Sequence, residues 1–270
     1  NHPDLKSNLW INENEIPNNG VDDDNNGYVD DVHGINSFNE NGNPQDKIGH
    51  GTLVAGVIGA IGNNGLGGSG VLWKTKIMAI NGDNGHGVMS FEGAIRGGYY
   101  AATMGATVIN GSWGTYTPSP ALKQMIEDIA GYGAILVNAV GNNSNDIDRR
   151  HLEYPASYRL PNMITVTATN KKDELVHYAD FGPKYVDIAA PGWGILTTKL
   201  GGGTTVSAGT SIAAPFVTAA VALVMAEFPE LTYQQVKEKI LNSVDIVLSL
   251  RDKVRSKGRL NLYKALAYPL

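Results

Sequence analysis

The alternation of short apolar runs with longer helix-like segments most limits how this chain can fold. Five short runs are rich in β-branched residues: 76–80, 107–110, 135–139, 164–168 and 186–188. They are apolar along most of their length, which is typical of strands covered on both faces. Helical periodicity marks five further segments: 52–61, 90–104, 120–132, 213–227 and 232–242. This order predicts an α/β fold with a mostly parallel, twisted sheet between helices in three layers.

Composition favours one folded domain over residues 1–270. A chain of 270 residues with 42% hydrophobic content can bury a large core, and we find no Pro/Ser-rich linker and no internal repeat. Thr232 and Gln235 have the spacing of a capping box at the start of the last predicted helix. The absence of cysteine excludes disulfides, cysteine catalysis and thiolate metal sites.

The charge pattern excludes two classes of partner. The chain has 21 Lys and Arg against 26 Asp and Glu, without the basic stripe that follows phosphates along a nucleic acid. No apolar run approaches the roughly 20 residues of a membrane span, and the N-terminus lacks the pattern of a signal peptide. We therefore expect a soluble domain that binds neither nucleic acid nor the membrane interior.

Two segments place a reactive side chain where a glycine turn meets an apolar helix: GHGTLVAG at residues 49–56 and GTSIAAP at residues 209–215. A serine at a helix start lies near backbone N–H groups that can face a developing oxyanion. Alone, His50 is more often a surface histidine and Ser211 more often a helix cap, each by roughly ten to one. The two sequence contexts together reverse those odds.

Further motifs follow in order along the chain: NHPDL, NGSWG, VNAVGNN, YPASY, DIAAPG and GRLN. With the two glycine-flanked segments, they make the chain resemble the subtilisin-like serine peptidases over its whole length. The resemblance implies a parallel sheet of seven strands between helices, with the site at its carboxyl edge. It also implies that His50 is the general base, Ser211 the nucleophile and Asn142 the oxyanion donor.

These roles fit the chemistry of acyl transfer. Ser211 is a weak nucleophile until His50 removes its proton, and the imidazolium then protonates the leaving amine. The side-chain amide of Asn142 would join the Ser211 N–H at the tetrahedral oxygen. Loss of such a donor costs about 10²–10³ in kcat, a figure that itself comes from a subtilisin. The alternative, a plain loop asparagine or an N-glycan acceptor at Asn142, has about one chance in ten.

The same resemblance implies an extended polypeptide substrate, with a prodomain or an inhibitor as further partners. Two segments would bind the substrate backbone: Ser112, Trp113 and Gly114 as a wall of the primary pocket, and Gly85, His86 and Gly87 as an edge strand. Glu153 falls near the floor of that pocket, where a carboxylate would favour a basic P1 side chain. A solvent-pointing Glu153 is an equally good interpretation of the sequence.

The stretch NGVDDDNNGYVDD at residues 19–31 suggests calcium. Asp22, Asp24 and Asn26 hold the first, third and fifth places of a calcium loop, Tyr28 can add a carbonyl, and Asp30 can be the ninth-position ligand. His33 stands at the twelfth place, so the loop is not a full EF-hand. Its acidic residues would repel one another unless a cation neutralised them. A solvated loop without metal keeps about one chance in five.

A second calcium site is implied by the resemblance alone. Asp4 and the loop IGNNGL at residues 61–66 resemble the family's strong calcium site, with side-chain oxygens from Asp4 and Asn63. The register of that loop is uncertain by one residue.

The chain departs from the family pattern at three places. Leu53 and Phe216 stand where the family usually has histidine, which is a mild change at helical positions facing a core. The catalytic aspartate of the family ends a strand just before the H-P-D-L segment, so we expect residues 1–270 to lack that strand and aspartate and to have little activity alone. Neither Asp4 nor Asp46 is a convincing replacement.

Two functions are therefore compared. The first is a calcium-stabilised serine endopeptidase, and the alternative is a catalytically inactive pseudo-peptidase that binds extended peptides. Retention of His50, Ser211 and Asn142 favours the peptidase, because a binding module needs none of these side chains. A serine esterase is a distant third because no G-x-S-x-G motif occurs. We expect an extracellular or secretory location.

Overall fold

The computed structural model describes residues 1–267, which separate into two compact units. The first unit comprises Asn1–Ala106 and Thr197–Thr205, and the second comprises Thr107–Leu196 and Val206–Leu270. Each unit is described by itself. The expectation of one domain stays a prediction.

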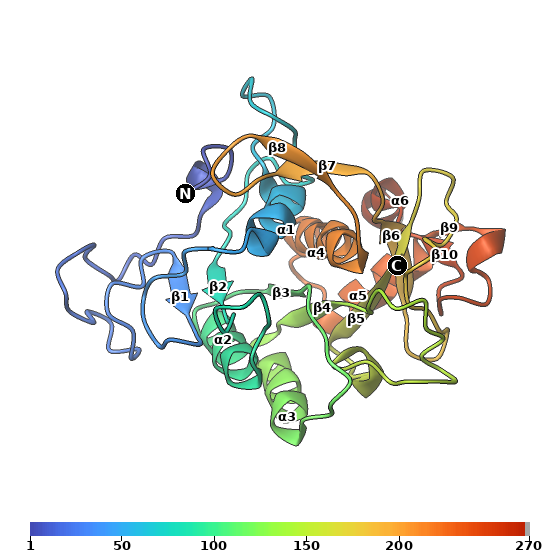
Figure 1. The fold of residues 1–270 in the computed structure, drawn as a ribbon, viewed down its shortest axis with the longest axis horizontal. Helices are drawn as coiled ribbons and strands as arrows, with labels where there is room; N and C mark the ends of the chain where they lie inside the picture. Colours follow the sequence, from blue (N-terminus) through green and yellow to red (C-terminus); the bar gives the residue numbers. More distant parts are fainter. Residues whose placement is uncertain (268–270) are drawn as a thin grey trace. The chain divides into compact units, whose positions relative to one another are not determined.

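The first unit combines long irregular segments with two helices and a small sheet. Its elements are η1 (Lys6–Asn8), β1 (Gly34–Asn36), α1 (His50–Gly59), β2 (Ala79–Asn81) and α2 (Phe91–Thr103) (Figure 1). Strands β1 and β2 are parallel, with Ile35 opposite Ile80. Helix α1 begins at His50 because Gly49, with φ of 101°, turns the chain sharply just before it.

The second unit is the larger α/β body. Its elements are β3 (Val108–Gly111), α3 (Pro120–Ile129), η2 (Ala130–Tyr132), β4 (Ile135–Ala139), η3 (Ala156–Tyr158), β5 (Met163–Thr169), β6 (Ile188–Pro191), α4 (Thr210–Glu227), α5 (Tyr233–Asn242), β9 (Asp245–Ile246), η4 (Leu248–Leu250), β10 (Gly258–Arg259) and α6 (Leu262–Ala267). A further two-stranded sheet pairs β7 (Ile195–Thr198) with β8 (Thr204–Ser207).

The six-stranded sheet of the second unit has the order β3-β4-β5-β6-β10-β9. All neighbours are parallel except β9 and β10. Every residue of β4 and β5 is buried, as expected for central strands of a parallel sheet. Residues Val137 and Val166 pack with Val221 of α4 in one core cluster, while Figure 1 shows α3 on the opposite side of the strands. This arrangement confirms the α/β class with a mostly parallel sheet between helices.

The predicted elements match the structure closely where their apolar pattern is strong. Strand β4 has the predicted bounds, and the capping box of Thr232 and Gln235 is present at the start of α5. In place of the seven-stranded sheet implied by the resemblance, residues 1–267 form one six-stranded sheet and two separate two-stranded sheets, β1–β2 and β7–β8. Strands β1, β7, β8, β9 and β10 were not predicted.

Helix α4 is the one helix among residues 1–267 long and apolar enough to cross a membrane. Most of it is buried inside the protein, where Ala213, Val217 and Val224 belong to the core around the sheet. A buried core helix of this kind has the same composition as a membrane span, so the helix is weak evidence for one.

Candidate active site

The predicted nucleophile lies at the start of α4. Gly209, with φ of 142°, precedes the helix, and Ser211 is the helix's second residue. The Ser211 hydroxyl donates to the Ser112 carbonyl at 3.3 Å, and the Ser112 hydroxyl donates to the Ser211 carbonyl at 2.8 Å. The segment after β3 is therefore bound directly to the turn that carries Ser211.

A chain of polar contacts holds this segment in place. Asn110 donates through Nδ2 to the Ser112 hydroxyl at 2.8 Å, and Thr218 of α4 donates to the Asn110 Oδ1 at 2.8 Å. Asn138 of β4 donates to the carbonyl of Trp113 at 3.0 Å. Helix α4, β3 and β4 thus fix the backbone that the sequence predicts as a pocket wall.

Asn142 follows β4 and reaches the same turn. The backbone N–H of Thr210 donates to its Oδ1 at 2.9 Å. The Thr210 hydroxyl lies 3.2 Å from both the backbone nitrogen and the carbonyl oxygen of Gly141. Because the amide oxygen of Asn142 is engaged, its amide nitrogen is the atom left to donate. Asn142 and Ser211 therefore occupy neighbouring positions in one rigid set of contacts.

Glu153 is buried, with 5% of its surface exposed, so it does not point into solvent. Its Oε2 would be 3.4 Å from a Cβ added to Gly114, and its Oε1 accepts from Asn143 Nδ2 at 3.3 Å. Burial and the charge of Asp180 raise the pKa of Glu153 to about 7, against hydrogen bonds from Tyr116 and Asn143. The side chain lies beside the predicted pocket wall as a carboxylate that titrates near neutral pH.

Asp180 is the second carboxylate of this cluster, and no sequence pattern drew attention to it. It is fully buried, and its pKa is raised by burial, although N–H groups of Asn145 and Asn143 hydrogen bond to it and oppose the rise. Among residues 1–267, no ion pair involves Glu153 or Asp180. The second unit therefore buries two carboxylates without a cationic partner next to the segment that carries Asn142.

The predicted general base belongs to the first unit. His50 is the first residue of α1 and is exposed as a residue. Loss of hydration lowers the pKa of its imidazole, and the charge of Asp46 opposes the shift. Asp46 caps the helix, because its carboxylate accepts from the N–H groups of Ile48, Gly49 and Thr52. The pairing of His50 with Ser211 stays a prediction.

Gly85, His86 and Gly87 form an exposed turn, whereas the resemblance implied an extended edge strand. The side chains of Asp83 and Asn84 accept hydrogen bonds from the backbone N–H groups of Gly85 and His86, which bends the chain. Their contact with substrate stays a prediction.

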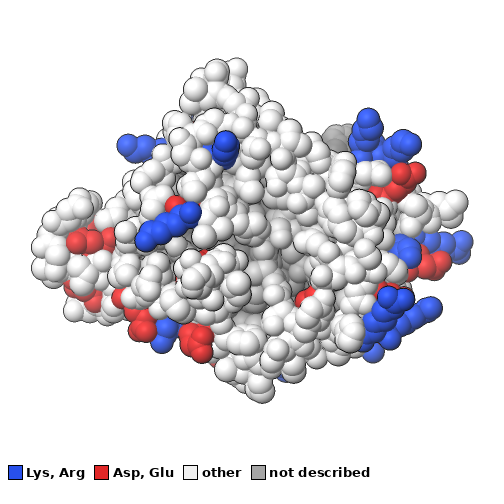
Figure 2. Space-filling model, in the orientation of Figure 1, with Lys and Arg blue, Asp and Glu red and all other residues white. Residues whose placement is uncertain are grey.

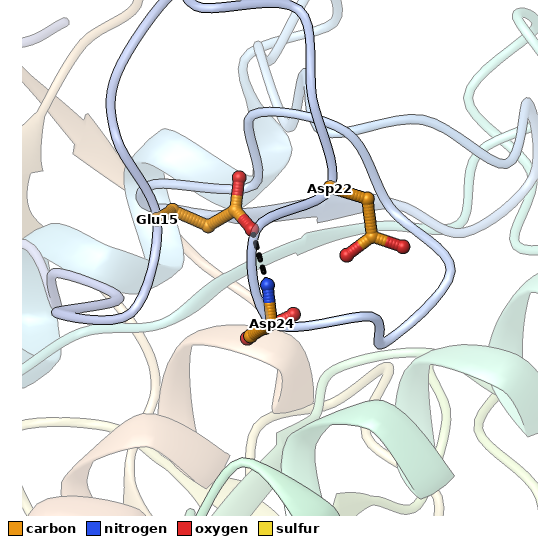
Figure 3. Close-up of side chains that lie close together, drawn as sticks. All are labelled: Glu15, Asp22 and Asp24. Atoms are coloured by element: carbon orange, nitrogen blue, oxygen red, sulfur yellow. Dashed lines mark hydrogen bonds between the residues drawn. The ribbon is translucent and has the colours of Figure 1, made fainter.

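The acidic loop gathers three carboxylates in the first unit. One oxygen each from Glu15, Asp22 and Asp24 lies within 4.8 Å of the others, and Figure 3 shows the three side chains around a common space. Figure 2 shows acidic side chains gathered where Figure 1 draws this loop. Glu15 was not among the predicted ligands, because it precedes the calcium-loop pattern by seven residues and matches no spacing rule. Three converging carboxylates suit a hard cation.

The other predicted ligands of the acidic loop have protein partners. The Asn26 N–H donates to Asp22 and Asp24, and the Tyr28 N–H donates to the Asn26 Oδ1. The carboxylate of Asp30 accepts from the N–H groups of Asn19 and Gly20, so in this structure it contacts the backbone at the start of the acidic loop. Metal binding by all these residues stays a prediction.

The second calcium candidate contains an unpartnered buried oxygen. Asp4 has 1% exposure, and its Oδ2 is buried without a hydrogen-bond partner. Asn64 donates to the Asp4 Oδ1 at 2.6 Å, so Asn64 is the residue of this loop whose side chain contacts Asp4. Asn63, named from the sequence, is its neighbour with φ of 58°. Metal binding by Asp4 and Asn63 stays a prediction.

The structure thus places Ser211 at the start of a buried helix and the Asn142 amide at the end of a parallel strand of an α/β sheet. The chain belongs to the subtilase family, whose model matches residues 1–263. It is 33% identical over 282 residues to subtilisin-like protease 1 of Plasmodium berghei, covering 98% of this chain and 47% of that protein. It is 33% identical over 196 residues to subtilisin NAT of Bacillus subtilis subsp. natto, covering 73% and 50%.

Solved structures agree with this family. The epidermin leader peptide processing serine protease of Staphylococcus aureus has a TM-score of 0.80 and 26% identity, covering 98% of this chain and 72% of that one. The prenylagaramide maturation protease has a TM-score of 0.70 and 28% identity, covering 80% and 81%. The chain spans about half the length of the curated relatives it matches.

Proposed function

We propose that the chain is the peptidase domain of a serine endopeptidase, in which Ser211 attacks the peptide carbonyl and His50 moves the proton. The observation that carries the proposal is the bond from the Thr210 N–H to the Asn142 Oδ1, which leaves the amide nitrogen to donate beside Ser211. Together with the Ser211 N–H, that nitrogen would bind the tetrahedral oxyanion. The relatives named as proteases support the same reaction.

Covalent labelling tests this proposal. A fluorophosphonate should label the full-length protein, because residues 1–270 alone are expected to have little activity. In the full-length protein, Ser211→Ala should abolish the label while Ser249→Ala, at an exposed serine, retains it. Turnover of a peptide library should fall in His50→Ala and fall about 10²–10³-fold in Asn142→Ala. Peptide binding without labelling or turnover would instead favour the pseudo-peptidase.

Glu153 is proposed to select a basic P1 side chain. Its carboxylate is buried beside Gly114, whose backbone is proposed to bind the P1 region, and no cationic side chain of residues 1–267 pairs with it. A Lys or Arg at P1 would supply the missing positive charge. Glu153→Gln should lose preference for P1 Lys over P1 Met by about tenfold or more, since the shape stays and the charge is lost. Equal cleavage of both by the unmodified protein would refute the assignment.

Calcium is proposed to stabilise the first unit. Glu15, Asp22 and Asp24 would hold one ion, and Asp4 with Asn64 would hold another, where the orphaned Asp4 Oδ2 fits a hard cation. When bound, calcium would neutralise the converging carboxylates. The proposed role of calcium is structural and includes no chemical step.

Thermal unfolding tests the calcium sites. Calcium at a hundredfold excess over Kd should stabilise the protein, relative to chelator, by about 2.7 kcal/mol for each occupied site. Glu15→Gln and Asp4→Asn should each weaken that response, whereas Glu13→Gln, an exposed acid in the same segment, should not. Identical unfolding with calcium and with chelator would refute both sites.

The substrate is proposed to be an extended polypeptide, with a prodomain or an inhibitor as a further partner. An extracellular or secretory location is proposed with it, since loops of moderate calcium affinity fill where calcium is abundant. Secretion assayed with a tagged full-length protein tests the location.

A further inference from the structure

The buried carboxylate of Asp180 binds the backbone on one side of Asn142. Its Oδ1 accepts from the N–H of Asn143 at 2.9 Å and from the N–H of Asn145 at 2.7 Å. On the other side of Asn142, the backbone N–H of Asp180 donates to the Gly141 carbonyl at 3.0 Å. One residue therefore holds the chain immediately before and immediately after Asn142.

The segment that carries Asp180 is itself firmly attached. The Thr167 hydroxyl, in β5, donates to the Asp180 carbonyl at 2.6 Å. The Ser144 N–H donates to the Tyr178 carbonyl at 2.8 Å, and the Phe181 N–H donates to the Asn145 carbonyl at 2.9 Å. These bonds connect the 141–145 loop to the sheet through residues 178–181, all within the second unit.

Gly141 shows how closely the loop packs on this carboxylate. Its φ is 126°, and a Cβ added there would lie 2.3 Å from Asp180 Oδ2. No side chain, not even a methyl group, fits between the Gly141 backbone and the Asp180 carboxylate. The carboxylate therefore limits the loop by contact as well as by hydrogen bonds.

The geometry points to Asp180 as a positioning residue for the oxyanion donor Asn142, acting as a hydrogen-bond acceptor for the 141–145 loop. This inference rests on the proposed peptidase function. Asp180 does not touch the reacting atoms; it fixes the backbone from which the Asn142 amide projects, while the Thr210 N–H fixes the amide itself. A donor must lie within about 0.5 Å of its productive position to stabilise the transition state fully.

Two substitutions separate hydrogen bonding from charge. Asp180→Ala removes the acceptor, and we expect kcat to fall about 10- to 100-fold while KM changes less than about threefold. This loss of kcat is smaller than the loss from deleting the oxyanion donor itself, because Asn142 remains but is less well placed. Asp180→Asn retains an amide oxygen for both N–H groups, so its kcat should stay within about threefold of the parent. Equal losses in the two variants would overturn the acceptor role.

Asp148 offers a matched control in the same unit. Its carboxylate accepts from the Lys184 N–H at 2.9 Å, a similar backbone contact in another loop. Asp148→Ala should leave kcat unchanged even where its thermal stability falls. A parallel loss of kcat in Asp148→Ala, scaled to lost stability, would show that Asp180 acts only through folding.

A double-mutant cycle tests whether Asp180 acts through Asn142. In an Asn142→Ala background, Asp180→Ala should lower kcat by less than about threefold, because the donor it positions is gone. The same 10- to 100-fold loss in both backgrounds would overturn the inference.

Hydrogen exchange tests, independently of turnover, whether Asp180 holds the 141–145 loop. The amides of Asn143 and Asn145 should exchange at least about tenfold faster in Asp180→Ala than in the parent, and near the parent rate in Asp180→Asn. Unchanged exchange would overturn the inference. An unmodified protein that neither takes the fluorophosphonate nor cleaves peptides would refute the proposed function, and the exchange rates would still decide whether Asp180 holds the loop.

Discussion

Glu153→Gln is expected to stabilise the protein at alkaline pH although it alters a buried residue. Glu153 has 5% exposure, and its carboxylate lies near that of Asp180 without a cationic partner among residues 1–267. Glutamine has nearly the same shape and no charge to bury. Its amide oxygen can still accept from Asn143, so the variant keeps that contact and removes the repulsion between the two carboxylates.

The magnitude follows from the shift of the Glu153 pKa from 4.5 to about 7. A raised pKa means that the folded state disfavours the carboxylate. The penalty is therefore absent below pH 4.5, grows as the pH rises toward 7, and is complete above that value. At 1.36 kcal/mol per pKa unit, the upper limit is about 3 kcal/mol. Relaxation of the site and its remaining hydration reduce the expected gain to about 1–2 kcal/mol.

Urea unfolding from pH 4.5 to pH 8.5 measures the difference. The stability of Glu153→Gln minus that of the parent should be near zero at the acid end and about 1–2 kcal/mol at the alkaline end. Glu230→Gln, at an exposed carboxylate, should show no such trend. A difference that is constant with pH, or that grows as the pH falls, would contradict the assigned cause.

Three further changes have defined outcomes. Asp46→Ala should lower the free energy of unfolding, measured in urea, by about 1–2 kcal/mol above pH 4 and by less below it. Burial would raise the Asp46 pKa, but hydrogen bonds from Gly49, Thr52 and Ile48 lower it. The stabilisation by Asp46 is therefore lost as the pH falls through its lowered pKa. Gly141→Ala should cost more than about 2 kcal/mol and abolish turnover, because φ is 126° and Asp180 fills the Cβ position. The acid limb of kcat/KM should lie below pH 6.5, because loss of hydration lowers the His50 pKa despite the charge of Asp46; a limb above that value would contradict it.

The sequence predicted the elements whose signal is local. Strands β4 and β5 are rich in β-branched residues, and the start of α5 has its capping box. Each of these elements was located within a residue. Helix α4 was predicted to begin three residues late, because Thr210 and Ser211 have no apolar periodicity and the glycine turn defines the start. Strands β9 and β10 have two residues each and form only by pairing across the chain.

The site was predictable where a motif is contiguous and not where contacts are distant. Asn142 and Ser211 stand in recognisable motifs, and the structure connects both through Thr210. Asp180 and Glu15 occur in no motif, because their contacts join segments far apart in sequence: 35 residues between Asp180 and Asn145, and 8 residues or more from Glu15 to the loop it contacts. Long-range acceptors of this kind appear only when the fold brings them to their donors.

Asp180 and Glu153 differ in how far hydrogen bonds within the fold offset the cost of burying their carboxylates. The oxygens of Asp180 accept two backbone N–H groups, so its burial is offset by the loop it holds. Glu153 has weaker compensation, namely a 3.3 Å contact from Asn143 and a hydrogen bond from Tyr116, and its pKa rises accordingly. A buried acid with a stability penalty is useful where a ligand supplies the opposite charge, since ligand binding then recovers the penalty. The cost of Glu153 in the free protein is thus the same energy that would favour a cationic P1 side chain, while hydrogen bonds within the fold offset part of the cost of Asp180.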